Sequence, residues 1–217
     1  MNDKFCIGLL AFGKEHIEEC NNLITNINNI NPNIKIYVVT DNSKLVKNVF
    51  KKIEINDCEF NYNLKRIVIE NALIDENIVM FLDTDIKIGT DIDFDLINEI
   101  GENEIHIVFE NKELNNTNTF LNQMNKKYNT KLGGINEHCF IISNGDKTKK
   151  LLNVWGKLDN ESREIQTLHL GKKGTCEGVL MWLSIEMSKI KKIKSGPIQK
   201  KIFSKIYHFN QPVRKII

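Results

Sequence analysis

The sequence lacks the features that mark several large protein classes. Its five cysteines are odd in number and form no Cys-x-x-Cys pair, which argues against a disulfide framework or a zinc ribbon and favours a reducing compartment. The 30 lysines and arginines nearly balance the 28 aspartates and glutamates, so charge gives no reason to expect a nucleic-acid partner. Only three prolines occur, and none marks a domain boundary.

Long hydrophobic runs are absent as well. The segment MNDKFCIGLLAFGKEH at residues 1–16 has an apolar run too short for a signal peptide or a membrane span. We therefore expect a cytoplasmic protein without a transmembrane segment. With 217 residues, 41% of them hydrophobic and 27% charged, the chain can bury one core, and we predict a single domain over residues 1–217.

Apolar and amphipathic segments alternate along the first half of the chain. We predict strands over 4–10, 34–40 and 77–82, and helices over 14–29, 43–51 and 62–74. This alternation predicts an α/β fold with a mostly parallel sheet and helices on its faces. The second half is less regular. It contains predicted strands at 105–109 and 139–143, predicted helices at 146–157 and 176–189, a loop-rich stretch at 110–134 and an extended, basic tail from residue 190.

Two carboxylates, Asp83 and Asp85, follow the apolar run 78–82. On an extended chain, side chains two residues apart point the same way, and open α/β sheets bind ligands at the carboxyl ends of their strands. Adjacent carboxylates repel unless a cation joins them, and oxygen ligands suit Mg²⁺ or Mn²⁺ completed by phosphate oxygens. A solvated turn is the alternative. The apolar Ile86 and Ile88 that follow favour the metal site.

The stretch IVMFLDTDIKIG resembles the D-x-D segment of nucleotide-sugar glycosyltransferases with the GT-A fold. Other segments resemble further parts of such enzymes in the same order. These are IKIYVVTDN (34–42) for the strand at the nucleotide pocket, LKRIVIENAL (64–73) for the helix before the D-x-D strand, GGINEHCFIIS (133–143) for the acceptor side, CEGVLMWLSIEM (176–187) for the helix whose first acidic residue faces the sugar, and IYHFN (206–210) for the C-terminal metal-binding histidine.

The resemblance is closest to small retaining members of the blood-group and glycogenin types. It implies a single GT-A (Rossmann-like) domain, with a nucleotide-binding half at 1–89 and an acceptor-side half with a C-terminal tail at 90–217. It also implies a hexosyltransferase that moves a hexose from a nucleoside diphosphate sugar, expected to be a UDP-sugar, to a glycan or other hydroxyl acceptor with retention.

Roles for the metal-site residues follow from the resemblance. Mn²⁺ or Mg²⁺ would bridge the diphosphate, with Asp85 as a direct ligand and His208 as a ligand from the other side. Asp83 would hold the ribose, or the metal through water, and Thr84 would lie with it against the nucleotide. A surface or packing position is the alternative for His208.

Other candidates lie near the presumed nucleotide. Thr40 and Asp41 end a strand, and Asp41 would accept from the base or ribose or else cap a helix starting at residue 43. Lys65, like the neighbouring Arg66, would pair with the diphosphate or else occupy a solvated helix face. At Phe12 the bare backbone of the following glycine would let the nucleotide approach, and a plain turn is the alternative.

Glu177 is the candidate catalytic carboxylate. It opens a helix, where it would orient a sugar hydroxyl or act as base or nucleophile. The alternative is a glutamate that stabilises the first helical turn. His169 could shape the same part of the site, whereas His106 and His138 are interpreted as structural. Trp155 and Trp182, at helical spacing, are predicted to pack in the core.

Three other functions share parts of this pattern. A phosphatase of the haloacid dehalogenase type would use Asp83 as its nucleophile, but its motif normally follows the first strand and is completed by a later acidic pair. A sugar nucleotidyltransferase would need a Gly-rich, Arg-bearing loop after strand one, which LLAFGKEH lacks. A non-catalytic nucleotide-sugar-binding protein stays open as a third alternative.

Overall fold

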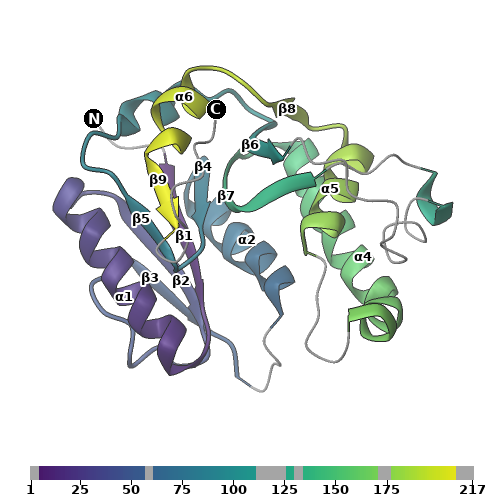
Figure 1. Cartoon of the computed structure of the whole chain (residues 1–217), viewed down its shortest axis with the longest axis horizontal. Coiled ribbons are helices and arrows are strands. Elements are labelled where there is room, and N and C mark those ends of the chain that lie inside the picture. The colour runs from purple at the N-terminus through teal and green to yellow at the C-terminus, as the bar shows by residue number, and fades with distance from the viewer. Residues whose placement is uncertain (1–4, 57–60, 111–125, 130–133, 171–176, 209–217) are drawn as a thin grey trace.

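The architecture is a twisted sheet with helices on both faces (Figure 1). The structure is a computed structural model that describes residues 5–56, 61–110, 126–129, 134–170 and 177–208. For residues 62, 108–110, 134–136, 164–170, 177 and 208 it describes the backbone alone.

Seven strands form the main sheet in the order β3-β2-β1-β4-β7-β6-β8. They are β1 (Phe5–Ala11), β2 (Lys35–Thr40), β3 (Lys51–Glu54), β4 (Ile78–Leu82), β6 (Glu104–Glu110), β7 (Gly134–Ser143) and β8 (Lys191–Ile193). Within this sheet only β7 runs antiparallel to its neighbours β4 and β6, and the other pairs are parallel. The prediction of an α/β fold with a mostly parallel sheet is confirmed.

A second, two-stranded sheet joins distant parts of the chain. β5 (Ile86–Ile88) pairs antiparallel with β9 (Ile206–His208). The helices are α1 (Gly13–Ile30), α2 (Lys65–Asp75), α4 (Asp146–Leu170), α5 (Glu177–Ser188) and α6 (Pro197–Lys201), with short 3-10 turns η1 (Tyr62–Leu64), η2 (Phe94–Glu99) and η3 (Phe203–Lys205).

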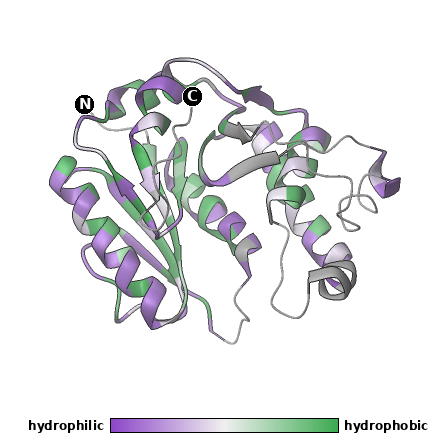
Figure 2. Cartoon of the chain, in the orientation of Figure 1, coloured by the Kyte–Doolittle hydropathy of each residue, from purple (hydrophilic) through white to green (hydrophobic). Residues whose placement is uncertain are grey.

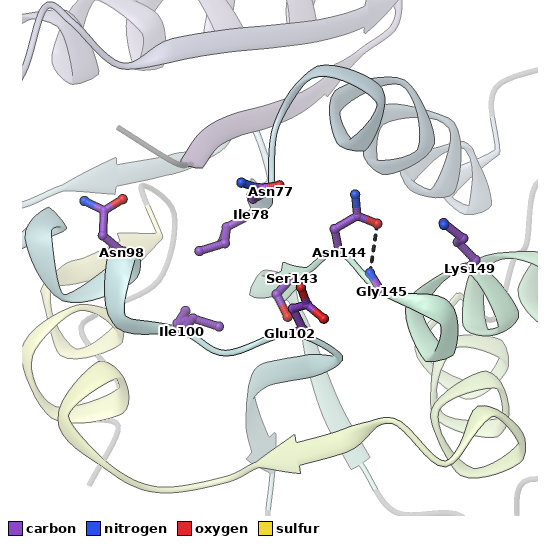
Figure 3. Close-up of a pocket in the computed structure, with 9 residues that line it drawn as sticks. All are labelled: Asn77, Ile78, Asn98, Ile100, Glu102, Ser143, Asn144, Gly145 and Lys149. Atoms are coloured by element: carbon purple, nitrogen blue, oxygen red, sulfur yellow. Dashed lines mark hydrogen bonds between the residues drawn. The ribbon is translucent and has the colours of Figure 1, made fainter. Parts of the chain in front are cut away.

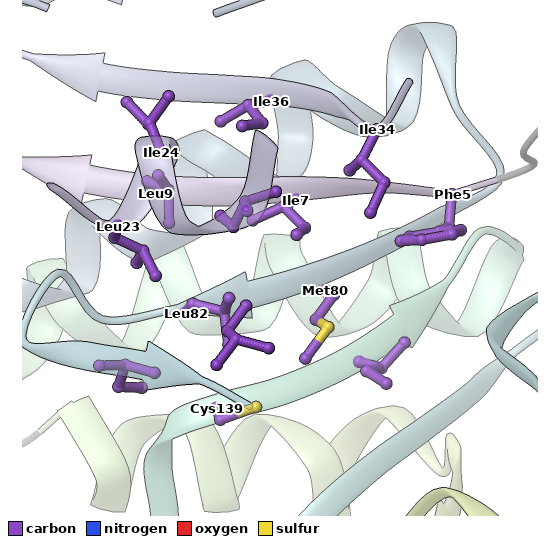
Figure 4. Packing of buried hydrophobic residues seen from close by; sticks show 14 of the residues in the cluster. Phe5, Ile7, Leu9, Leu23, Ile24, Ile34, Ile36, Met80, Leu82 and Cys139 are labelled. Carbon is purple, nitrogen blue, oxygen red and sulfur yellow. The ribbon is translucent and has the colours of Figure 1, made fainter. Parts of the chain in front are cut away.

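Alternation along the strands divides the core between the two faces of the sheet. In β1, Phe5, Ile7 and Leu9 pack with α1, whereas Cys6 and Leu10 belong to the cluster that includes α2, α4 and α5. Figure 4 shows the α1 side, where side chains of β1, β2, β4 and β7 meet those of the helix. In Figure 2 the central strands are mostly green, whereas α1 has alternating green and purple bands, as an amphipathic helix must.

A glycine in β1 lets α2 approach the sheet closely. A Cβ at Gly8 would lie 2.7 Å from Cγ1 of Val68, which is closer than real Cβ contacts allow. The first residue of α2 is Lys65. Because α2 packs tightly on the central strands, its first turn is held against the carboxyl end of the sheet.

Three sequence predictions of local structure differ from the structure. No helix forms at 43–51; this segment is a turn followed by β3, because Lys51–Glu54 pairs with β2. α4 continues to Leu170, well beyond the predicted end at residue 157. The tail from residue 190 is not simply extended, because it contains α6 and η3 between β8 and β9.

Helix lengths also bear on membrane insertion. Within the described part of the chain, no helix combines the length and the apolar character that crossing a bilayer requires.

Candidate active site

Several predicted site residues come together at the carboxyl ends of the central strands. The parallel strands β1, β2 and β4 end there at Ala11, Thr40 and Leu82. The reversed strand β7 passes the same edge near its beginning, where Cys139 pairs with Leu82. We call this end of the strands the carboxyl edge. Residues 12–13, 40–41, 83–85 and 137–138 lie there.

Asp83 lies at the centre of a compact charged cluster. Its Oδ1 is 2.9 Å from Lys65 Nζ, and its Oδ2 is 2.6 Å from His138 Nδ1. The backbone N–H of Asp83 also donates to the His138 carbonyl at 2.9 Å. We call Lys65, Asp83 and His138 the Asp83 cluster. Since both carboxylate oxygens have cationic or N–H partners, Asp83 is firmly oriented.

Lys65 is buried to an unusual degree for a lysine. Its side chain is 1% exposed, its Nζ is 3.3 Å from the Glu137 carbonyl, and it lies 5.2 Å from the centroid of the Phe81 ring. A buried ammonium requires a partner of opposite charge, and Asp83 supplies it. The alternative of a solvated helix face is therefore wrong for Lys65. Pairing with a diphosphate stays a prediction.

The cluster shifts the acidity of two of its members. Burial by itself would raise the pKa of Asp83, but the charge of Lys65 and the hydrogen bond from His138 together hold that pKa below its ordinary value. The hydrogen bond to Asp83 raises the pKa of His138, although burial opposes this. Asp83 is therefore ionised, and the imidazole donates to it through Nδ1–H.

Thr84 and Asp85 continue the chain around the end of β4. Thr84 is buried, and its hydroxyl donates to Glu19 Oε2 of α1 at 3.3 Å, on the opposite face of the sheet from Lys65. Asp85 is partly exposed and immediately precedes Ile86. The backbone of His208 pairs with Ile86, so β9 brings His208 within one residue of Asp85 in register.

The described residues include no group of three or more histidine, cysteine, aspartate or glutamate side chains that could hold a metal ion. The side chains of His208 and Glu177 fall outside that description. The structure therefore brings the backbones of the predicted metal site together, and metal binding by Asp83, Asp85 and His208 stays a prediction.

The nucleotide-side candidates meet at the ends of β1 and β2. Thr40 pairs with Ala11 in register, and the next residue, Asp41, accepts hydrogen bonds from the backbone N–H of Gly13 at 3.1 and 3.0 Å. Phe12 is buried at the N-cap position of α1. Asp41 thus caps α1 across strands rather than a helix at residue 43, which does not form.

Gly13 has φ +78°, a conformation that favours glycine, and nothing lies within 4 Å of the Cβ it lacks. The start of α1 therefore presents bare backbone at the carboxyl edge. Close approach of a nucleotide at this point stays a prediction.

The start of α5 lies against β7. A Cβ at Gly178 would be 3.1 Å from Oε2 of Glu137, so the first turn of α5 packs next to the residue that precedes His138. Glu177 is the first residue of this helix. The backbone of Glu177 therefore stands near the Asp83 cluster, and its catalytic role stays a prediction.

His138 is the site residue that sequence reasoning missed, since it was interpreted as structural. Nothing in the local pattern NEHC distinguishes it; only the pairing of β4 with β7 brings it to Asp83.

His106 and Trp155 do have the predicted structural positions. His106 is buried beside Glu104, and Trp155 is fully buried and donates to Asn63 Oδ1 at 2.6 Å. Arg66 lies against Gly156 of α4 and forms an ion pair with Glu70.

A hollow of about 400 Å³ lies at the opposite end of the strands, which we call the amino edge (Figure 3). Its lining includes Asn77 and Ile78 at the start of β4, and Ser143 and Asn144 at the end of β7. The cluster of charged groups and the hollow are thus at opposite ends of β4. We place the candidate active site at the carboxyl edge because the charged side chains and the helix starts converge there.

No protein-family model and no curated protein matches this sequence. Solved structures do resemble the fold. One is a glycosyltransferase involved in the glycosylation of the major capsid of PBCV-1, with a TM-score of 0.52, 11% identity, and coverage of 96% of this chain and 95% of that one. Another is the glycosyltransferase GlyE of Streptococcus pneumoniae TIGR4, with a TM-score of 0.52, 14% identity, and coverage of 90% of this chain and 46% of that one. At such identities the likeness concerns the fold, and the chain has the GT-A-like α/β fold that its sequence predicted.

Proposed function

We propose that this protein is a metal-dependent glycosyltransferase. It would transfer a hexose from a nucleoside diphosphate sugar, expected to be a UDP-sugar, to a hydroxyl of a glycan or other acceptor, with retention. The observation that carries this proposal is the position of Asp83 and Asp85 at the carboxyl end of β4, in a fold that is similar to those of glycosyltransferases.

The contacts at the site support different roles for the two aspartates. Lys65 and His138 hold both carboxylate oxygens of Asp83. We assign the direct contact with an added cation to Asp85. Asp85 would supply a carboxylate oxygen, the kind of ligand that hard divalent ions prefer. His208, whose backbone pairs with Ile86 next to Asp85, is the proposed second ligand. Asp83 suits the supporting role of orienting the ribose or a metal-bound water.

When bound, Mn²⁺ or Mg²⁺ supplies positive charge to the diphosphate as the bond to the sugar breaks. The protein's own residues bind and orient the donor. In this proposal Asp41 and the backbone at Phe12 and Thr40 bind the nucleoside, and Glu177, the first residue of α5, acts on the sugar. Lys65 fixes Asp83, which keeps the turn at residues 83–85 in one geometry.

The phosphatase alternative receives less support from this geometry. It requires Asp83 to attack as a nucleophile, but both carboxylate oxygens are held, one by Lys65 and the other by His138.

Calorimetric titration of UDP, with and without Mn²⁺, tests the proposal. We expect tight binding only with the ion, because a carboxylate by itself repels a diphosphate. Asp85→Asn should lose the metal-dependent part of the affinity. Asp146→Asn, which changes a fully exposed aspartate at the start of α4, serves as the matched control. Equal affinity in both titrations, or normal binding by Asp85→Asn, would contradict the proposal.

Transfer itself is tested with a panel of nucleoside diphosphate sugars. Metal-dependent release of the nucleoside diphosphate identifies the donor, and the anomeric configuration of the released sugar or product distinguishes retention from inversion.

A further inference from the structure

The short strand β5 is attached to α1 as well as to β9. It pairs with β9 in a two-stranded sheet and contacts α1 on its other side (Figure 1). On the side of α1, the N–H of Ile88 donates to the side-chain oxygen of Asn26 at 2.9 Å. The N–H of the next residue, Gly89, donates instead to the Lys205 carbonyl just before β9, at 2.8 Å. Asn26 therefore takes the position that a further strand would have along this side of β5.

A second contact joins the same helix to the turn before β5. Thr84 is buried, and its hydroxyl donates to Glu19 Oε2 at 3.3 Å. Glu19 and Asn26 are seven residues apart, so they lie on one face of α1, about 10.5 Å apart along its axis. Thr84 and Ile88 are four residues apart, which spans up to about 13 Å on an extended chain. The two contacts match in spacing, so residues 84–88 run alongside α1.

Both proposed metal ligands are attached to this segment. Asp85 lies between the two points of contact with α1, directly before Ile86. His208 belongs to β9, and its backbone pairs with Ile86. Ile86 and Ile88 are each 1% exposed and belong to the core cluster on the α1 side of the sheet. A shift of β5 along α1 would therefore move Asp85 and the backbone of His208 as well.

The contacts of Asp83 do not replace this attachment. Lys65 and His138 hold Asp83 from α2 and β7, at the end of β4. The chain then passes Thr84 and enters β5, whose neighbours are α1 and β9. The position of β5 thus depends on α1, on the opposite face of the sheet from Lys65.

We propose that Asn26 is a positioning residue for the metal site. Its hydrogen bond to Ile88 fixes β5 on α1 and so sets the spacing between Asp85 and His208 that one divalent ion requires. Mg²⁺ demands ligands at about 2.0–2.1 Å in near-ideal geometry, so a small shift of β5 weakens its binding. This inference rests on the proposed metal-dependent transfer, and it gives a role to a side chain that lies outside the candidate active site.

Three variants of α1 separate this role from general support of the helix. Asn26→Ala removes the acceptor for the Ile88 N–H. Asn26→Asp keeps an oxygen at the same position and should restore the contact. Asn22→Ala is the matched control, because Asn22 is an exposed asparagine one turn earlier in α1 and its replacement changes helix propensity by the same amount.

The measurement is titration of Mn²⁺ in the presence of UDP, with the free ion followed by electron paramagnetic resonance. We expect Asn26→Ala to weaken Mn²⁺ affinity by about tenfold, the lower end of the range for groups that orient metal ligands. Asn26→Asp should bind nearly as tightly as the wild-type protein, and Asn22→Ala should equal it. Thermal melts of the same variants establish that each is folded at the assay temperature, where a loss of stability by itself leaves the affinity of the folded protein unchanged.

The outcomes distinguish this inference from the proposed function. If the wild-type protein binds Mn²⁺ with UDP and Asn26→Ala binds it equally well, the role of Asn26 is overturned and the proposed metal site stands. The role is also overturned if Asn26→Asp is as weak as Asn26→Ala, or if Asn22→Ala shows the same loss. If the wild-type protein binds no Mn²⁺ in the presence of UDP, the proposed metal dependence fails together with this inference.

Discussion

The two ends of β4 differ in how the protein fills them. At the carboxyl end, charged groups are buried and already paired with one another, as Lys65 is with Asp83. At the amino end there is a hollow of about 400 Å³, whose lining includes the amides of Asn77 and Asn144 and the charged side chains of Glu102 and Lys149. The two ends therefore differ in how their charges are placed. Lys65 is buried and paired directly with Asp83, whereas Glu102 and Lys149 are exposed at the hollow.

The largest expected effect concerns turnover. If Glu177 is the catalytic carboxylate, as proposed, Glu177→Gln should lower kcat by about 10²–10⁴-fold. Melting and UDP affinity should stay near normal. Glu102→Gln, beside the hollow, is the matched control and should leave kcat unchanged. Sugar-transfer assays and thermal melts check both variants.

If Glu102→Gln lowers kcat more than Glu177→Gln does, the active site is not at the carboxyl edge. A Glu177→Gln protein that melts early but transfers sugar at the wild-type rate would assign Glu177 to helix stabilisation, which is worth about 0.3–1 kcal/mol.

The next effect concerns stability. Lys65→Met keeps the apolar stem but leaves Asp83 without its buried cation, and the free energy of unfolding should fall by about 3 kcal/mol. Lys149→Met, an exposed lysine at the amino edge, should change it by less than about 0.5 kcal/mol. Urea denaturation measures both. Equal losses in the two variants would mean that the charged cluster contributes no special stability.

Two glycines, one at each end of the sheet, test the comparison through smaller changes in stability. Gly145 at the amino edge has φ +146°, and a Cβ there would lie 2.3 Å from Asn103 Oδ1, which accepts from the Lys147 N–H at the start of α4. Gly145→Ala should cost about 2–3 kcal/mol, because strain adds to a displaced cap. A Cβ at position 13 would have no atom within 4 Å, so Gly13→Ala should lower the free energy of unfolding by about 1 kcal/mol through backbone conformation alone. Urea midpoints that reverse this order would contradict the described geometry.

The smallest effect is a pH dependence of stability. The folded state lowers the pKa of Asp83, so its contribution is present above the unfolded pKa and is lost as pH falls through the folded value. The folded state raises the pKa of His138, so its contribution is full below about 6.5 and is lost as pH rises through the folded value.

Unfolding free energy measured in urea across pH should therefore decline on both sides of a maximum. His138→Asn should lose the decline on the alkaline side and keep the acidic one. An alkaline decline that survives in this variant would have its origin elsewhere in the molecule.

Much of the first half of the fold was predictable because local pattern and tertiary structure agree there. The apolar spacing of Ile17, Cys20 and Leu23 predicted α1, and all three are buried. The segment KKIE at 51–54 has no such pattern. It becomes a strand because β2 offers an unpaired edge, which is information that the segment itself does not contain.

Prediction of the site residues was limited in the same way, because only local patterns could be used. Asp83 and Asp85 were predicted because two carboxylates after an apolar strand form a local signal. His138 contacts Asp83 across 55 positions of sequence, and Lys65 was predicted only as a possible diphosphate partner. Contacts between elements depend on strand order, and a single sequence gives no direct record of that order.

The reversed direction of β7 has a consequence for how this protein could diversify. β6 ends and β7 begins at the carboxyl edge, where Glu110 pairs with Gly134. Both ends of this connection therefore lie at the same end of the sheet as Asp83, whereas β1, β2 and β4 belong to an earlier stretch of the chain. Exchanging the connection would leave those three strands unchanged, so under the proposed function it is the place to introduce a different acceptor preference.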